Sequence, residues 1–510
     1  MITEKQYTEL CEVSNEILNR PDSKIERVAI PWLHVIREHP IFLAKYETLF
    51  DQNNFLGLFL KNIKESFSNR LLWWRQIFRA IRSDGKSWFG EDDLSGEIDY
   101  LFISHLLNPN QYSKTEDFYY GNMPNDLINK NKSVVVASIS HFSNHKGFFN
   151  ENFVKSNVPR LFFSDSLGFK REIAIRKRLK KESVKLRIIA KDERKTLKKR
   201  IFQEASKQVL AQDAQATLRL EHQINALVSR LMPKVIIVPY EGHAFERIVF
   251  ASARSVSSNI KCVSYQHTGV FRLSNAIRQT LSKQYNPDLI LTSGSESKFE
   301  LEKALSLKKT PVSILGSTRG IIDSKGISKT RLLKKRNACL VIPEGINSEC
   351  IRLFEFSLMC ANQRPDILFV WRLHPIITFE KLKKINKNFK SLPQNIILSS
   401  DSIEQDINRC NWVLYRGTTA VYKAISGGLR PFYLSIPEEI SIDPLYKLKT
   451  WRINVNRPID LFFYINKDLN SNFEYHVDNF EMAQAVCEKK FSCINIKVLT
   501  NLVIKRPFNQ

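Results

Sequence analysis

From residue 133 onwards, short apolar runs alternate with longer amphipathic stretches. The apolar runs are rich in β-branched residues and end in polar turns, which predicts strands. In the first half they are 133–139 (SVVVASI), 160–166 (RLFFSDS), 233–242 (PKVIIVPYEG), 261–270 (KCVSYQHTGV), 287–294 (PDLILTSG) and 310–317 (TPVSILGS). Residues 168–232 are polar and predict helices. Apolar strands that alternate with amphipathic helices predict a parallel sheet covered on both faces.

The same alternation starts again after a segment that lacks apolar periodicity. This segment, 318–337, carries Gly, Ser and basic residues, and we expect it to link two domains. Further strands are expected at 338–345, 365–375, 395–400, 412–417 and 429–436. The pattern therefore predicts two Rossmann-like αβα domains that face a cleft, with ligands at the carboxyl ends of the strands. The predicted divisions are a helical N-terminal region (1–130), a first domain (131–320) and a second domain (321–510).

The predicted N-terminal helical region contains an aromatic-rich amphipathic stretch at 54–83 (NFLGLFLKNIKESFSNRLLWWRQIFRAIRS). Two interpretations are open. The apolar side chains around Trp73 and Trp74, beside Arg75, Arg79 and Arg82, would suit a helix that lies on an anionic membrane. The alternative, which is the more common case, is a helix that packs on the body of the protein.

Composition narrows the class of protein. Seventy-seven Lys and Arg against 52 Asp and Glu give a net charge of +25. A solvated basic face would explain this charge, and the alternatives are an anionic partner such as a membrane surface or an acidic glycan. Aromatic-interleaved RNA-binding motifs and zinc-finger spacings are absent, so no nucleic-acid partner is expected. The eight cysteines form no CxxC pair, which favours a reduced compartment. No apolar signal region or membrane-length span is found. We expect a cytoplasmic protein, with peripheral attachment to the inner membrane as an open alternative.

Polar residues follow the predicted strands of the first half. GxGxxG, P-loop and GxSxG motifs are missing, which argues against dinucleotide enzymes, P-loop ATPases and serine hydrolases. Instead, Glu241 ends one buried strand and is followed by Gly242, which permits a tight turn. A carboxylate there can accept a proton from a hydroxyl, although an ion pair with Arg247 would also explain it. His267 ends the next strand, so Glu241 and His267 are predicted to converge as catalytic residues.

Two further sets of polar residues follow strands of the second half. Arg372 and His374 lie two residues apart before a Pro, which places both on one side of the strand end and offers a cation and a ring N–H to an anion. Arg416, Gly417, Thr418 and Thr419 stand at a strand-to-helix turn, where backbone N–H groups and hydroxyls can hold a phosphate. A helix N-cap would explain one of these threonines. Together the two sets predict an anion-binding cradle.

The order Glu-Gly, His-Pro and Thr-Thr resembles the motifs of bacterial GT-B sialyltransferases, polysialyltransferases and Kdo transferases, which use CMP-activated ulosonic acids. The segments PYEGHAFERIVFASAR…YQH and RLHP…YRGTTAVYKAISGGLRP are similar to proteins of surface-carbohydrate biosynthesis, in patches over 233–434. The resemblance implies that Glu241 is the general acid/base, that His374 binds or protonates the CMP phosphate, and that Thr418 and Thr419 hold it. One departure is that the acidic pair is Tyr240-Glu241, with a single carboxylate.

These observations predict a GT-B glycosyltransferase that moves a sugar, in particular an ulosonic acid from a CMP donor, to a glycan or glycolipid acceptor of capsule or lipopolysaccharide. Charge suggests Arg372 or Arg416 for a donor carboxylate. No cofactor and no metal is expected, because protein cations and helix termini can neutralise the leaving phosphate. The alternatives are a GT-B transferase that uses a UDP- or GDP-sugar, and a non-catalytic assembly factor that binds glycan or membrane.

Overall fold

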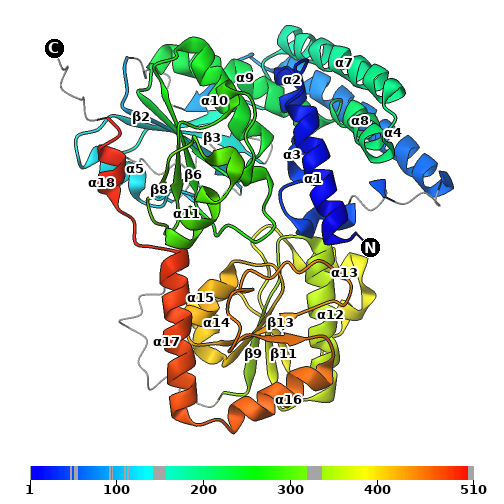
Figure 1. Ribbon diagram of the computed structural model, residues 1–510, viewed down its shortest axis with the longest axis vertical. Coiled ribbons are helices and arrows are strands. Elements are labelled where there is room, and N and C mark those ends of the chain that lie inside the picture. The colour runs from blue at the N-terminus through cyan, green and yellow to red at the C-terminus, as the bar shows by residue number, and fades with distance from the viewer. Residues whose placement is uncertain are drawn as a thin grey trace.

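A computed structural model describes residues 2–45, 49–50, 55–90, 94, 96–107, 111, 114–141, 157–318 and 336–503. Within these ranges the chain forms two mainly parallel sheets with helices around them, stacked one above the other in Figure 1. The predicted α/β fold with two Rossmann-like units is confirmed.

The first sheet has eight strands in the order β1-β4-β3-β2-β5-β6-β7-β8. Neighbouring strands are parallel except for β1, which runs antiparallel to β4. Helices α9 and α10 contribute to the core on one face, and α5 and α18 to the core on the other. The strands are β1 (Trp88–Gly90), β2 (Tyr100–Leu106), β3 (Val134–Ser140), β4 (Arg160–Phe163), β5 (Val235–Pro239), β6 (Lys261–Gln266), β7 (Leu289–Thr292) and β8 (Val312–Ile314).

The second sheet has six parallel strands in the order β11-β10-β9-β12-β13-β14. All five positions of β9 are buried, which explains its continuous apolar sequence. The strands are β9 (Ala338–Ile342), β10 (Leu368–Trp371), β11 (Ile396–Leu398), β12 (Trp412–Tyr415), β13 (Arg430–Leu434) and β14 (Ile453–Val455).

Helices fall into three groups along the chain. Those before and within the first sheet are α1 (Glu4–Leu18), α2 (Ile25–Val28), α3 (Pro31–Val35), α4 (Phe55–Arg82), α5 (Met123–Ile128), α7 (Phe169–Asp192), α8 (Thr196–Gln208), α9 (Gln212–Leu231), α10 (Ala244–Val256) and α11 (Ser295–Glu302). Those of the second sheet are α12 (Asn347–Gln363), α13 (Phe379–Ile385), α14 (Ile403–Arg409), α15 (Ala420–Ser426) and α16 (Pro458–Leu469). Two C-terminal helices follow, α17 (Phe473–Lys490) and α18 (Ile496–Thr500).

The N-terminal region is not wholly helical, which corrects one prediction. Helices α1, α2 and α3 share a core with α7 and α8 and form a helical lobe beside the first sheet (Figure 1). Strands β1 and β2, however, also lie before residue 131 and belong to the first sheet. The first α/β unit therefore starts earlier in the chain than its sequence pattern indicates.

The C-terminal segment returns from the second sheet to the first. The carbonyl of Lys490, at the end of α17, accepts a hydrogen bond from the Ser293 hydroxyl at 3.0 Å, and the Ser317 N–H donates to the Ser492 carbonyl at 2.9 Å. Helix α18 then packs against α5. Most of the predicted linker, 319–335, lies outside the described residues. No helix in the described ranges is long and apolar enough to cross a membrane.

Candidate active site

Each sheet has one point where successive strands are added on opposite sides. In the first sheet the chain builds β2, β3 and β4 in one direction and then returns to place β5 on the other side of β2. In the second sheet β12 is placed beside β9 in the same way. The crevice outside the carboxyl ends of the strands at such a switch point is where α/β proteins bind ligands. Glu241 follows β5, and Glu344 follows β9.

The turn that carries Glu241 is fixed by its own neighbours. The carboxylate of Glu246 accepts three backbone N–H groups, from Glu241, Gly242 and His243, at 2.8, 2.8 and 2.9 Å. Gly242 has a φ of +91°, and a Cβ there would lie 2.4 Å from the backbone of Ala276. Only glycine fits this position. The turn therefore holds Glu241 in place at the switch point.

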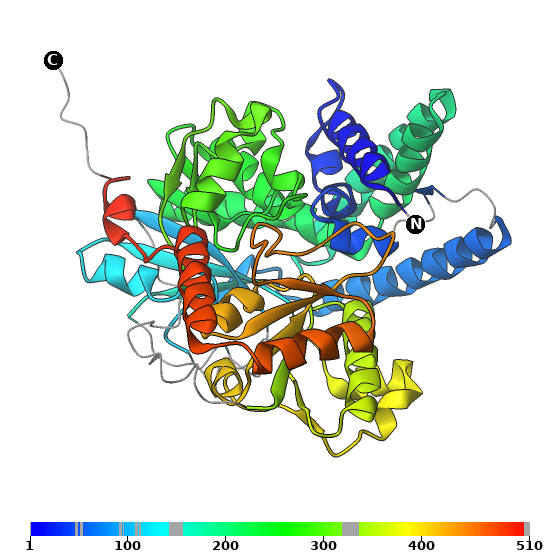
Figure 2. The same cartoon turned by 60° about the horizontal axis from the view of Figure 1, so that its bottom comes forward.

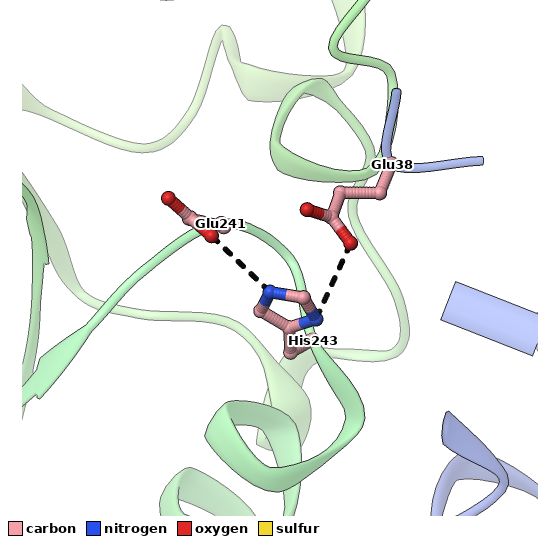
Figure 3. A group of neighbouring side chains, drawn as sticks. All are labelled: Glu38, Glu241 and His243. Atoms are coloured by element: carbon pink, nitrogen blue, oxygen red, sulfur yellow. Dashed lines mark hydrogen bonds and ion pairs between the residues drawn. The ribbon is translucent and has the colours of Figure 1, made fainter. Parts of the chain in front are cut away.

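Glu241 belongs to a line of three charged groups that also contains Glu38 and His243, here called the Glu–His–Glu triad (Figure 3). Its Oε2 lies 3.3 Å from His243 Nε2, while His243 Nδ1 lies 3.7 Å from Glu38 Oε2. The hydroxyl of Thr268, after β6, donates to Glu241 Oε1 at 3.1 Å. The expected alternative partner, Arg247, donates instead to Asn286 and to backbone carbonyls.

The triad holds Glu241 and His243 in charged form. Burial alone would raise the pKa of Glu241, but the hydrogen bond from His243 and the charges of His267 and His243 hold it well below its usual value. Burial disfavours the charged form of His243, but the carboxylate charge of Glu38 and the contact with Glu241 raise its pKa to about 10. At neutral pH the site therefore contains a carboxylate, Glu241, paired with the imidazolium of His243.

His267 lies beside Glu241, as the sequence predicts. Both line a cavity of about 290 Å³ at the ends of β2, β5 and β6. The cavity also holds His105 and His141, whose Nδ1 and Nε2 atoms are 2.9 Å apart. Burial, with the charges of the neighbouring histidines, holds the pKa of His105 well below its usual value. Its ring is therefore neutral, with one nitrogen that donates and one that accepts a hydrogen bond.

A second, larger cavity of about 740 Å³ adjoins the first. Both cavities share His105, His141, Thr217 and Phe245 in their linings. The larger one extends past the ends of β3 and β4 to the inner side of α4, where Gln76 contributes to its wall. Its volume lies in the range typical of small-molecule sites.

Glu344 is a carboxyl group that the sequence analysis did not single out. Burial, together with the negative charges of Glu349 and Glu241, raises its pKa to about 7, although the Gly345 N–H opposes the change. Because the charge of Glu241 is one of these causes, the two switch-point carboxyl groups interact electrostatically. A Cβ on Gly417 would lie 3.4 Å from Glu344 Cγ, so the turns after β9 and β12 are in contact. Glu241 and Glu344 each belong to a Glu-Gly pair that follows a buried strand.

The predicted donor residues fall into two groups. His374 lies against the turn after β9, where a Cβ on Gly345 would be 2.9 Å from His374 Nδ1. Gly417, buried, belongs to the same set of turns. Thr418 is buried and its hydroxyl accepts the N–H of Ala420 at 3.3 Å, one residue before the N-cap position of α15. Together with Thr419, the residue before α15, these residues lie after strands of the second sheet, as the sequence predicts.

The two predicted arginines are held by carboxylates of the protein. Arg416 is buried and its guanidinium contacts Glu349 at 2.6 Å and Glu439 at 2.8 Å. Arg372 contacts Asp406 at 2.8 Å and the carbonyl of residue 401 at 2.6 Å. These pairs hold both guanidinium groups within the protein, so a donor carboxylate would have to compete with the protein's own carboxylates for either arginine.

A metal ion was not expected, and the Glu–His–Glu triad is where one could bind. One atom from each of its three members lies within 4.8 Å of the others. The two carboxylates approach opposite nitrogens of His243, however, and its raised pKa keeps the ring protonated. A protonated imidazole is not a metal ligand. The residues as arranged fit an ion pair better than a metal site.

No family model and no curated protein matches the chain. Among solved structures it is similar to UDP-GlcNAc 2-epimerase from Neisseria meningitidis bound to UDP-GlcNAc, at 11% identity and a TM-score of 0.47, over 80% of this chain and 100% of that one. It is also similar to the glycosyltransferase SnogD from Streptomyces nogalater, at 11% identity and a TM-score of 0.43, with the same coverage. Similarity at this level identifies neither a substrate nor a reaction. The two-sheet architecture is established by the strand order and register of this chain.

Proposed function

We propose that this chain is a GT-B glycosyltransferase that moves a sugar from a nucleotide-linked donor to a glycan acceptor. The observation that carries the proposal is the pair of carboxyl groups, Glu241 and Glu344, that follow the switch-point strands of the two sheets. Transfer to a hydroxyl needs a group that accepts the hydroxyl proton and a separate region that stabilises the leaving phosphate. A cavity on the side of the first sheet and polar turns on the side of the second supply these two requirements.

Glu241 accepts the proton of the acceptor hydroxyl in this proposal. It is ionised at neutral pH and borders a cavity lined by histidines that can hydrogen-bond sugar hydroxyls. Its low pKa reflects the contact with His243. An acceptor hydroxyl that takes the place of His243 at Oε2 would release the carboxylate from this contact and make it more basic.

The donor lies on the other side, at the turns of the second sheet. His374, Thr418, Thr419 and the backbone at Gly417 bind its phosphate, and no metal is required. The resemblance of the Glu-Gly, His-Pro and Thr-Thr motifs supports an ulosonic acid carried by CMP as the donor, and capsule or lipopolysaccharide as the product. Because Arg372 and Arg416 are held by carboxylates, the donor's own carboxylate is not assigned to either arginine.

The first test is nucleotide release from a panel of CMP-, UDP- and GDP-sugars. Release from a CMP-sugar supports the full proposal, and release from a UDP- or GDP-sugar alone would retain the transferase and replace the donor. Glu241→Gln should lower the turnover of the folded protein by about 10²–10⁴-fold, because Gln keeps the shape but cannot accept the proton; its melting temperature should also fall, because the ion pair with His243 is lost. The exposed carboxylate of Glu302, on α11, provides a matched control as Glu302→Gln. Near-normal turnover in well-folded Glu241→Gln would remove this residue from the mechanism.

The second test is nucleotide affinity, measured by calorimetry with CMP. His374→Ala, and Thr418→Ala combined with Thr419→Ala, should each weaken binding about tenfold or more, since each removes hydrogen bonds to a charged group. Unchanged affinity in both variants would exclude the donor site from these turns. A non-catalytic glycan-binding factor would show no nucleotide release and would tolerate loss of both Glu241 and His374.

A further inference from the structure

Helix α4 carries a stripe of large apolar side chains on its outer surface. The members of this α4 stripe are between 48% and 64% exposed, and they are Phe67, Leu71, Trp74, Phe78 and Ile81. Their spacing of four, three, four and three residues places all five on one face of the helix. Single exposed apolar residues are ordinary, but a continuous stripe of five marks an interaction surface.

The opposite face of α4 is fixed to the protein. Gln76, Ile77 and Ala80 are buried, and Gln76 Nε2 donates to the backbone carbonyl of Asp165 at 2.9 Å. The guanidinium of Arg176 lies over the Trp73 ring, 4.9 Å from the centroid of that ring. In Figure 2 the blue helix α4 projects outward from the middle of the molecule, and its far end extends beyond the rest of the protein. The stripe therefore faces away from the body because the other side of the helix is anchored.

Arginines flank the α4 stripe on both sides. At about 100° per residue, Arg70 lies on one side of it, and Arg75 and Arg82 lie on the other. All three side chains are exposed. The neighbouring helix α7 contains ten Lys and Arg against three Asp and Glu, and two of these cations, Arg178 and Lys185, are paired with carboxylates. The outer face of α4 thus combines an apolar band with exposed arginines on both sides of it.

We propose that α4 docks on an anionic lipid surface, with the stripe in the boundary between head groups and acyl chains and the flanking arginines on lipid phosphates. Large apolar residues with Trp on one face and Arg beside them are the features of a helix that lies in a membrane interface. This interaction goes beyond the proposed transferase activity and does not depend on it.

The arginines beside the α4 stripe favour an anionic lipid surface over the other partners that could cover an apolar face. A second copy of the chain packed through the same face would bring two arginine-flanked helices together, and like charges oppose that contact. A nucleic acid would use the arginines but would leave the apolar stripe uncovered. An anionic bilayer satisfies both the apolar and the charged parts of the surface.

The test is co-sedimentation of the full chain with vesicles of phosphatidylcholine alone and of phosphatidylcholine with phosphatidylglycerol. We expect binding to the anionic vesicles only, with release as salt rises. Trp74→Ser combined with Phe78→Ser should lower the partition coefficient about tenfold or more. A matched control is Ile459→Ser with Phe463→Ser on α16, two residues with the same spacing and similar exposure, which should bind as the unmodified chain does.

Several results would overturn the proposal. They are failure of the unmodified chain to bind anionic vesicles at low salt, equal loss of binding in the α16 control, and full binding by the Trp74/Phe78 variant. A concentration-dependent dimer that disappears in the Trp74/Phe78 variant, without vesicle binding, would assign the face to a second copy instead. Replacing Arg70, Arg75 and Arg82 with Gln should remove the preference for anionic lipid; an unchanged preference would show that charge at α4 is not used.

Discussion

The Glu–His–Glu triad leads to a prediction about pH dependence. His243 Nε2 lies 3.3 Å from Glu241 Oε2, and the two side chains are 26% and 35% exposed. With an effective dielectric constant of about 40, between the values for a protein surface and for water, their attraction is about 2.5 kcal/mol. This energy corresponds to about two pH units in the pKa of Glu241. His243→Gln removes the charge and keeps a hydrogen-bond donor.

The sign of the effect follows from which form of Glu241 is active. The proposed base must be ionised, so turnover falls as pH falls through its pKa. In the unmodified protein this pKa is held well below its usual value, and the acidic limb lies at low pH. In His243→Gln we expect the limb to move up by about two pH units, because burial then dominates.

The reciprocal variant acts on the other limb. Glu38 Oε2 lies 3.7 Å from His243 Nδ1, and the same calculation gives about 2 kcal/mol, or about one and a half pH units. Glu38→Gln should therefore lower the pKa of His243 from about 10 towards neutrality. Loss of the imidazolium above that new pKa would let Glu241 become more basic in the alkaline range while leaving the acidic limb in place.

The assay is the pH dependence of kcat/KM for nucleotide release, with the ¹³C chemical shift of the Glu241 carboxylate as a readout that needs no turnover. His476→Gln, on α17, is a control for loss of a histidine away from the cavity. The reasoning is refuted if His243→Gln lowers turnover uniformly at all pH values with no change in the acidic limb or in the Glu241 titration.

Two stability predictions follow from the turns of the site. Arg416→Met should lower the free energy of unfolding by about 2 kcal/mol, because Glu349 and Glu439 lose one of their two contacting cations and keep only Arg352; urea unfolding that is unchanged, with weaker nucleotide binding, would assign Arg416 to the donor instead. Gly242→Ala should lower the free energy of unfolding by at least about 2 kcal/mol, since the new Cβ would lie 2.4 Å from backbone atoms. Gly96→Ala, also at positive φ but in open space, should lower it by less. Equal losses would mean that the strain of positive φ alone, not the close approach, fixes the turn.

The parallel strands of both sheets could be predicted because their apolar runs are bounded by polar turns. The strands that were missed, β1, β2 and β14, are either three residues long or, like β2, lie alone among helical segments. A short apolar run in such a place cannot be told from a buried helix by periodicity. Missing β2 also hid His105, which stands at the switch point because of that strand.

The site could be predicted only where its residues follow strands. Glu241 and His267 were found by this rule, and Glu344 could have been found by it, since its strand ends in Glu-Gly as well. Glu38 could not, because it reaches His243 from a turn some two hundred residues earlier in the chain. Sequence also gives no means of telling a ligand-binding arginine from one held in an ion pair, as Arg416 is.

Opposite environments separate the roles of the two switch-point carboxyl groups. Glu241 faces an imidazolium and a hydroxyl donor, and both favour its ionised form. Glu344 faces Glu349 and Glu241 instead, and burial raises its pKa to about 7, so a large fraction carries a proton at neutral pH. A pair of carboxyls with separated pKa values can divide acid and base work between them. In the proposed reaction the ionised member accepts the acceptor proton, while the protonated member can approach a donor phosphate without the repulsion that a second carboxylate would cause.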